Sequence, residues 1–128
     1  MALRMIQTRD APAAIGPYSQ AVQAGNWLFV SGQIGLNPET GEMVSEDFDP
    51  QATQVLENLK KILAAAGYEV SDVVSVDVFL TDMARFSSFN AIYEKVFSTH
   101  KPARALVEVS ALPRAALVEI KCVACRAG

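Results

Sequence analysis

The sequence predicts an α+β domain in which one mixed β-sheet carries two helices on one face. Six segments alternate apolar and polar residues as strands do, and two repeat apolar residues with helical spacing. Their order is β-β-β-α-β-α-β-β. The 128 residues, 51% of them hydrophobic, suit one domain over residues 1–128 with a single core.

The N-terminal segment combines a weak strand with an irregular loop. Residues 4–8 can form a short opening strand. Residues 10–18 include two prolines and a glycine, which favour an ordered but irregular backbone. Tyr18 ends this loop directly after Gly-Pro. Its phenol either packs on the core or stands at the mouth of a site.

The next two strands are expected over residues 19–24 and 27–34, with a hairpin turn at Gly25-Asn26. Ser31 and Gly32 interrupt the second of these strands. A glycine inside a strand often marks a bulge, or a close approach by another backbone or a ligand. Gly32 is therefore either a plain bulge or a substrate-binding position.

The first helix is expected to begin with Asp49 as its N-cap and Pro50 in its first position. Gly67 is expected to end it. The apolar stripe between them consists of Ala52, Val55, Leu56, Leu59, Ile62, Leu63 and Ala66.

A long strand is expected over residues 73–81, followed by a second helix that Asp82 can cap. The apolar face of the strand consists of Val74, Val76, Val78 and Leu80. The buried side of the helix is marked by Phe86, Phe89, Tyr93, Val96 and Phe97. Asn90 lies at the edge of that side, where its amide is either exposed or reaches a pocket.

The last two strands, residues 103–109 and 117–123, flank the breaker at residues 112–114 and are expected to pair as an antiparallel hairpin. Each has one apolar face and one face that mixes charged with large apolar residues. In the first strand the mixed face carries Arg104, Leu106 and Glu108. In the second it carries Leu117, Glu119, Lys121 and Val123.

The mixed faces imply that something covers the sheet. If the helices cover the apolar faces, six large side chains remain on the far face: Trp27, Phe29, Phe79, Leu106, Leu117 and Val123. Burying one of them is worth ~1.5–3 kcal/mol. We therefore expect a partner there, most simply another copy of the chain. Arg104, Glu119 and Ser31 would then lie near the rim of that interface.

Charge and composition exclude several functions. The net charge is −3 without a run of Lys or Arg, so a nucleic-acid partner is not expected. Neither a membrane-length apolar run nor a signal-peptide core is visible, so the cytoplasm is the expected compartment. Cys122, Cys125 and His100 are too few for a structural zinc site. No phosphate- or dinucleotide-binding motif is present, so neither a metal nor a cofactor is expected.

Two polar residues carry the candidate chemistry. The Arg104 guanidinium suits a carboxylate, but it could equally form a structural salt bridge with Glu108 or Glu119. Glu119 is either that partner or a group that orients a water and handles protons.

With these residues the sequence resembles the RidA/YjgF family of reactive-intermediate imine deaminases. The matching blocks follow one another along nearly the whole chain: 14–22, 30–34, 54–59, 78–83, 102–104, 107–109, 112–113 and 118–120. The resemblance implies a chorismate-mutase-like fold and a homotrimer with sites between subunits. It also implies hydrolysis of 2-imino acids or their enamines, such as 2-iminobutanoate and 2-iminopropanoate, to 2-keto acids and ammonia. Pyridoxal-phosphate-dependent dehydratases release these intermediates.

The resemblance also implies roles for individual residues. Arg104 grips the substrate carboxylate, and Glu119 aligns or deprotonates a water. The remaining assignments are catalytic roles for Tyr18 and Ser31, and substrate binding by Gly32 and Asn90. The chain departs from the family at Leu106, where many members have cysteine, and at Ser75, where many have lysine. An RNA-cleaving translation inhibitor and a non-catalytic keto- or imino-acid-binding protein are the alternatives.

Overall fold

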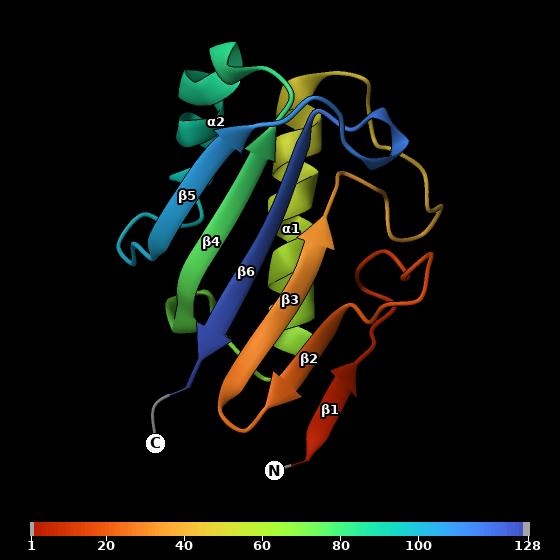
Figure 1. Cartoon of the computed structure of the whole chain (residues 1–128), viewed down its shortest axis with the longest axis vertical. Coiled ribbons are helices and arrows are strands. Elements are labelled where there is room, and N and C mark those ends of the chain that lie inside the picture. Colours follow the sequence, from red (N-terminus) through yellow and green to blue (C-terminus); the bar gives the residue numbers. More distant parts are fainter. Residues whose placement is uncertain (1, 127–128) are drawn as a thin grey trace.

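The structure is a computed structural model that describes residues 2–126; residue 1 and residues 127–128 of the expected domain lie outside them. Two α-helices cover one face of a six-stranded sheet (Figure 1). The strands are β1 (Leu3–Ile6), β2 (Ala21–Ala24), β3 (Trp27–Gln33), β4 (Val73–Leu80), β5 (Ala103–Glu108) and β6 (Val118–Cys125). The helices are α1 (Phe48–Ala65) and α2 (Phe86–Tyr93). The α+β prediction is confirmed.

The strand order is β1-β2-β3-β6-β4-β5, with β4 and β5 parallel and all other neighbours antiparallel. The predicted hairpin between the last two strands is therefore wrong. After β5 at the sheet edge, the chain returns between β3 and β4. The segment between the last two strands contains a 3₁₀ turn at Pro113–Ala115 and is long enough to pass β4.

The core lies between the sheet and α1, whose predicted apolar stripe is buried. The helix begins at Phe48 with Asp47 as N-cap, two residues before the predicted start. Phe48 is buried and meets Phe89 edge to face, so this contact lengthens the helix. Pro50 is tolerated because first-turn N–H groups have no partner within the helix. Gly67 has φ +80° after the last turn, as a helix-ending glycine should.

Two expected burial patterns need correction. The β4 register shifts between Val73 and Ser75, so Val73 is buried and Val74 is exposed. In α2, Phe86 is exposed, whereas Phe89 and Tyr93 are buried as predicted; Phe97, which follows the helix, is also buried as predicted.

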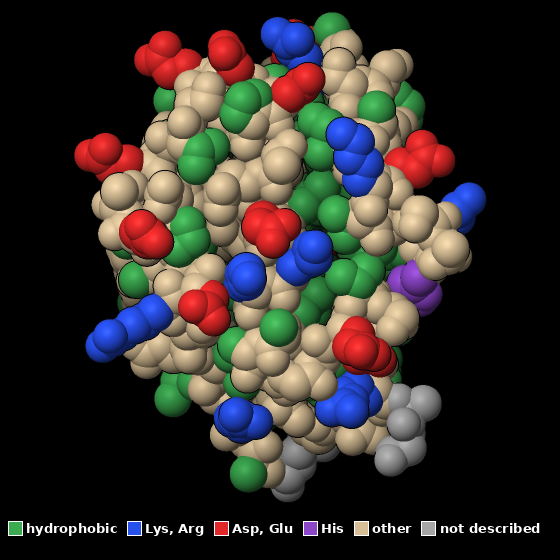
Figure 2. All heavy atoms as spheres, turned by 180° about the vertical axis from the view of Figure 1, so that it is seen from behind, with side chains coloured by type: hydrophobic (Ala, Val, Ile, Leu, Met, Phe, Trp, Pro, Cys, Tyr) green, Lys and Arg blue, Asp and Glu red, His purple; other side chains and the backbone are tan. Residues whose placement is uncertain are grey.

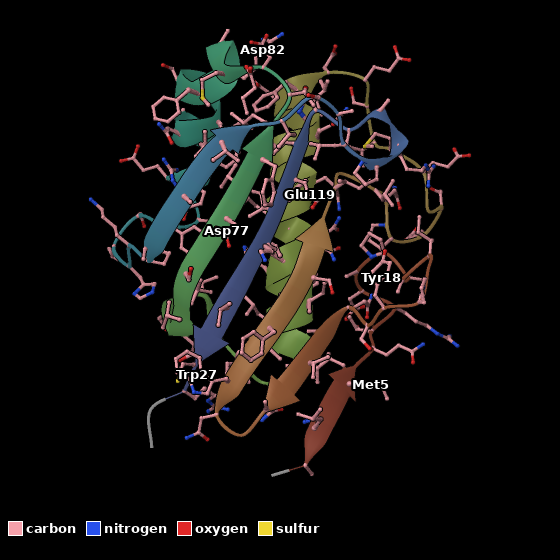
Figure 3. All side chains as sticks on the ribbon, in the orientation of Figure 1. Met5, Tyr18, Trp27, Asp77, Asp82 and Glu119 are labelled. Atoms are coloured by element: carbon pink, nitrogen blue, oxygen red, sulfur yellow. The ribbon has the colours of Figure 1, made fainter. Side chains whose placement is uncertain are left out.

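The other face of the sheet carries no helix and faces the viewer in Figure 1; we call it the open face. Trp27, Phe29 and Val107 lie on it about half exposed. The labelled side chains of Met5, Trp27, Asp77 and Glu119 stand on it in Figure 3.

Leu106 and Leu117 were also expected on the open face, and this is wrong. Both pack against the main core instead. Leu106 pairs with Val78, which is fully buried, so the two side chains point to the helix side. Neither α-helix of the described chain is long and apolar enough to cross a bilayer.

Candidate functional site

A bulge in β3 brings the backbone of Gly32 against the side chain of Glu119. The pairing of β3 with β6 shifts register between Val30 and Gln33, which confirms the expected bulge. A Cβ on Gly32 would lie only 2.5 Å from Oε2 of Glu119. Glycine is therefore required here because the carboxyl group lies directly over this backbone.

Glu119 lines a small cavity of about 70 Å³ together with Tyr18, Gly32 and Gln33; we call it the Glu119 cavity. The volume is enough for a few water molecules. The Glu119 side chain is half-buried. Its burial raises the pKa of the carboxyl group, and the nearby Lys121 ammonium lowers that pKa by a smaller amount.

The loop that carries Tyr18 is held by a buried amide. Gln20 donates from Nε2 to the carbonyl oxygens of Thr8, Ala11 and Pro12, and its Oε1 accepts from the Thr8 N–H. Tyr18 itself is half exposed at the end of this loop (Figure 3). Of the two predicted placements, the structure gives the phenol at the mouth of the cavity.

Ser31 lies beside the cavity and connects β3 to the same loop. Its hydroxyl donates to the carbonyl of Ser19, and its N–H donates to the carbonyl of Gln20. The hydroxyl hydrogen is therefore committed to the backbone, and only the oxygen lone pairs can receive a further hydrogen bond.

Arg104 lies on the other side of the sheet, which overturns its predicted position on the rim of the open face. It pairs with Val76, a buried residue of β4, so its side chain points to the helix layer. Its Nη1 donates to Oδ1 of Asn90 over 2.8 Å. Its Cζ lies 4.8 Å from the ring centre of Tyr93 in α2.

The salt bridges that the sequence allowed as an alternative for Arg104 do not form within residues 2–126. Within residues 2–126 neither Glu108 nor Glu119 lies within ion-pair distance of it, and the one ion pair found joins Lys60 to Glu57. Glu108 instead accepts a hydrogen bond from the N–H of Met83 over 2.7 Å.

Arg104 opens onto a cleft of about 320 Å³ on the surface, between β5 and the end of α2. We call it the Arg104 cleft; its other lining residues are Asn90, Tyr93, Glu94, Phe97, Lys101 and Pro102. The guanidinium is exposed and retains unused N–H donors, so the cleft can bind a small anion such as a carboxylate.

The structure therefore brings the predicted site residues together in two groups. Tyr18, Gly32 and Glu119 meet at the Glu119 cavity with Ser31 beside it, and Asn90 meets Arg104 at the Arg104 cleft. Sequence reasoning missed the contributions of Gln20, Gln33 and Tyr93. The helical spacing that predicts burial of Tyr93 signals its position on α2, but not its contact with Arg104.

The thiols line neither the Glu119 cavity nor the Arg104 cleft. Cys122 is buried, and this burial raises its pKa to about 12, whereas Cys125 is partly exposed. In the part of the chain that the structure describes, no three His, Cys, Asp or Glu side chains are close enough to share a metal ion.

These features define a small α+β protein with two separate polar sites, one basic and one acidic, on opposite faces of one sheet. The family model described as Endoribonuclease L-PSP matches residues 8–126. The chain belongs to this family, which is also called the RidA/YjgF family.

Three known proteins illustrate this similarity. A mouse 2-iminobutanoate/2-iminopropanoate deaminase is 47% identical, covering 94% of this chain and 90% of its own length. RidA from the Antarctic bacterium Psychrobacter superposes with a TM-score of 0.93 at 47% identity, over 96% of this chain and 99% of that one. E. coli TdcF with bound serine superposes with a TM-score of 0.92 at 42% identity, over 97% of this chain and 99% of that one.

Proposed function

We propose that this protein hydrolyses 2-imino acids and their enamine tautomers to 2-keto acids and ammonia. The substrate class is that of 2-iminobutanoate and 2-iminopropanoate, which pyridoxal-phosphate-dependent dehydratases release. The name of the mouse relative and the serine bound to the E. coli relative support a small substrate with a carboxylate and a nitrogen on the adjacent carbon.

The state of Arg104 carries this proposal. Its guanidinium is exposed in a cleft, and among the described side chains it has one hydrogen-bond partner and no carboxylate partner. A free planar fork of this kind matches a carboxylate through two parallel hydrogen bonds. A purely structural arginine on a strand would be expected to pair with a carboxylate of the fold.

We propose further that the active site needs two copies of the chain. Arg104 and Glu119 lie on opposite faces of the sheet, so one chain cannot present both to one small molecule. The half-exposed Trp27, Phe29 and Val107 make the open face a suitable surface for self-association. In a homotrimer, each neighbour would bring its Glu119 cavity to the Arg104 cleft of the next chain.

The chemistry then needs only proton transfer and water. Arg104 holds the substrate carboxylate and thereby fixes the C=N carbon. Glu119 accepts a proton from a water molecule as the water oxygen bonds to that carbon, and returns it to the nitrogen. In the resulting tetrahedral adduct, Glu119 takes the proton of the new hydroxyl group and delivers it to the amino nitrogen. The C–N bond then breaks as the C=O bond forms, which releases ammonia and leaves the keto acid. A carboxyl group whose pKa is raised by burial is suited to both accepting and donating a proton.

Tyr18 and Ser31 have supporting roles in this scheme. The Tyr18 phenol, at the mouth of the cavity, can donate to the substrate or to the attacking water. The Ser31 oxygen can accept a hydrogen bond from the imine nitrogen or the water, because its own hydrogen is already donated to Ser19.

A coupled assay tests the activity. Threonine dehydratase generates 2-iminobutanoate in semicarbazide buffer, and the rate of semicarbazone formation is followed with and without this protein. We expect the protein to slow semicarbazone formation, and Arg104→Ala to abolish the effect. Arg85→Ala is the matched control, because Arg85 also lies over a ring, that of Phe48 at 5.9 Å, but outside both sites. Equal effects of all three forms would contradict the role of Arg104.

Mixing two inactive variants tests the shared site. Arg104→Ala and Glu119→Ala chains are unfolded, combined in equal amounts and refolded together. If each site takes Arg104 from one chain and Glu119 from its neighbour, random assortment restores activity at about a quarter of the sites. Absence of recovery, with normal assembly of the mixture, would contradict a site shared between chains.

A further inference from the structure

The charge of Arg104 rests on an aromatic surface. Its Cζ lies 4.8 Å from the ring centre of Tyr93 and 6.0 Å from that of Phe89. Both distances are within the range of cation–π attraction, and the Tyr93 contact is the closer. No acidic side chain of residues 2–126 is within ion-pair distance of this guanidinium. The ring of Tyr93 therefore occupies the place where a carboxylate partner would be expected.

The Tyr93 ring is itself firmly held. It is 9% exposed and packs between Phe89, at 5.5 Å between ring centres, and Phe97, at 4.7 Å. Phe89 in turn meets Phe48 of α1 edge to face at 6.5 Å. This row of aromatic rings connects the support of Arg104 to the core.

The face of the ring, and not its oxygen, makes the contact that matters. Burial raises the pKa of Tyr93 to about 12, so the phenol carries no negative charge at neutral pH. Its hydroxyl is buried and has no hydrogen-bond partner among the described atoms. A neutral, unpaired hydroxyl does not hold a guanidinium, whereas the negative face of an aromatic ring does.

Asn90 completes the support from a second direction. It lies three residues before Tyr93 on α2, so both side chains project on the same side of the helix. Oδ1 of Asn90 accepts a hydrogen bond from Nη1, while Cζ lies over the ring of Tyr93. Together the two contacts use only one of the five N–H donors of the guanidinium.

We infer that Tyr93 is a positioning residue whose ring face holds the Arg104 guanidinium, leaving the donors that Asn90 does not use free for the substrate carboxylate. This inference rests on the proposed function of Arg104. A carboxylate in the place of the ring would occupy two donors and cancel the charge. The ring fixes the same group without either loss.

The test measures binding of 2-oxobutanoate, the product acid, by calorimetry, together with kcat, KM and thermal stability. Tyr93→Phe keeps the ring face and should bind within about twofold of the unmodified protein. Tyr93→Leu should weaken binding by about 3- to 5-fold, as loss of a cation–π contact with an exposed guanidinium predicts. We expect this loss mainly in KM, with kcat little changed. In an Arg104→Ala background, Tyr93→Leu should add less than about a twofold change.

A second set of variants keeps the shape of the ring. Phenylalanine with one, two or three ring fluorines at position 93 should weaken binding stepwise, because fluorine withdraws electron density from the ring face. This readout stays informative if Tyr93→Leu fails to fold, since a merely structural role of the ring would not follow the fluorine count.

Several results would overturn the inference: equal weakening by Tyr93→Phe and Tyr93→Leu, no dependence on fluorination, or an undiminished effect of Tyr93→Leu without Arg104. A failure of the proposed function gives a different pattern. In that case Arg104→Ala alone would leave 2-oxobutanoate binding unchanged, and the inference would fall with it.

Discussion

The Arg104 cleft and the Glu119 cavity differ in how their surroundings affect the charged group: the first leaves it exposed, and the second buries it in part. Arg104 is exposed, keeps its charge and most of its donors, and rests on a neutral ring. Glu119 is half-buried against the backbone of Gly32, and burial raises its pKa. The cleft measures about 320 Å³ and the cavity about 70 Å³. The exposed Arg104 in the larger cleft suits binding of a small acid. The half-buried Glu119 in the smaller cavity suits proton transfer to and from a water molecule.

The contrast follows from the two faces of the sheet. The helix side supplies aromatic side chains from α2 that can support an arginine at the sheet edge. The open face supplies a β-bulge that admits a carboxyl group against bare backbone. If each region does one task, changes at Glu119 should affect turnover, and changes at Arg104 should affect binding.

The largest effect is expected for Glu119→Gln. The amide keeps the shape of the side chain but cannot accept the proton of the attacking water, so kcat should fall by about 100-fold or more. Binding of 2-oxobutanoate should stay within a few fold, as measured by calorimetry. Asp77→Asn, on the same open face, is the control and should retain its kcat (Figure 3). Equal losses of turnover and binding would break the division between the two regions.

Arg104→Lys should show the opposite pattern, with a large loss of binding and a small change in kcat. Lysine keeps the positive charge but loses the planar fork, so product binding should weaken by about 10- to 100-fold. The rate at saturating substrate should change much less than with Glu119→Gln. Steady-state kinetics across a range of substrate generation rates separates KM from kcat. A loss confined to kcat would assign Arg104 to the chemical step.

The sequence predicted the two regions unequally. Strict alternation in β6 placed Glu119 on the open face correctly, because that strand has no bulge of its own. The same rule failed to place Arg104, because the apolar face of the edge strand β5 lies on the open side of the sheet and its mixed face meets the helices. Only the parallel pairing with β4, which aligns Arg104 with buried Val76, decides it.

Contacts between distant segments were also out of reach. The glycine in β3 signalled a close approach, but the group that approaches it, Glu119, belongs to the last strand. Likewise, helical spacing indicated that Tyr93 is buried, while its contact with Arg104 depends on how α2 packs against β5. Local patterns predicted which residues are special, and tertiary packing determines what each one touches.

A smaller effect on catalysis is expected for Gly32→Ala. The new Cβ would lie 2.5 Å from Oε2 of Glu119 and must displace the carboxyl group, so kcat should fall by roughly tenfold and stability by about 1–3 kcal/mol. Gly35→Ala is the matched control. Its Cβ would crowd the Gln51 backbone at 2.9 Å, so it should lose stability but keep kcat. Unchanged kcat in Gly32→Ala would show that the position of Glu119 is not critical.

A smaller effect is expected in the pH dependence of stability, to which the Glu119 carboxyl group should contribute. The pKa of Glu119 is raised above its usual value of 4.5, so the folded chain binds this proton more tightly than the unfolded chain. The resulting stabilisation is fully present below that value and is lost as the pH rises through the folded pKa. Relative to Glu119→Gln, the unmodified protein should therefore lose stability toward neutral pH. Urea unfolding at fixed protein concentration measures this, and a difference independent of pH would contradict the raised pKa.

The smallest signal of all is expected from binding of RNA to the protein. Lys and Arg side chains are interspersed with Asp and Glu over the helix side (Figure 2), and the net charge of the chain is −3. Tight RNA binding rests on several phosphate contacts and weakens steeply with salt, so a titration with single-stranded RNA should detect little binding at either of two salt concentrations. The contrary result is tight, salt-sensitive RNA binding that Arg104→Ala weakens and Glu119→Gln leaves intact. It would mean that the Arg104 cleft binds a phosphate group and not a carboxylate. The division between a binding region and a proton-transfer region would then no longer describe this molecule.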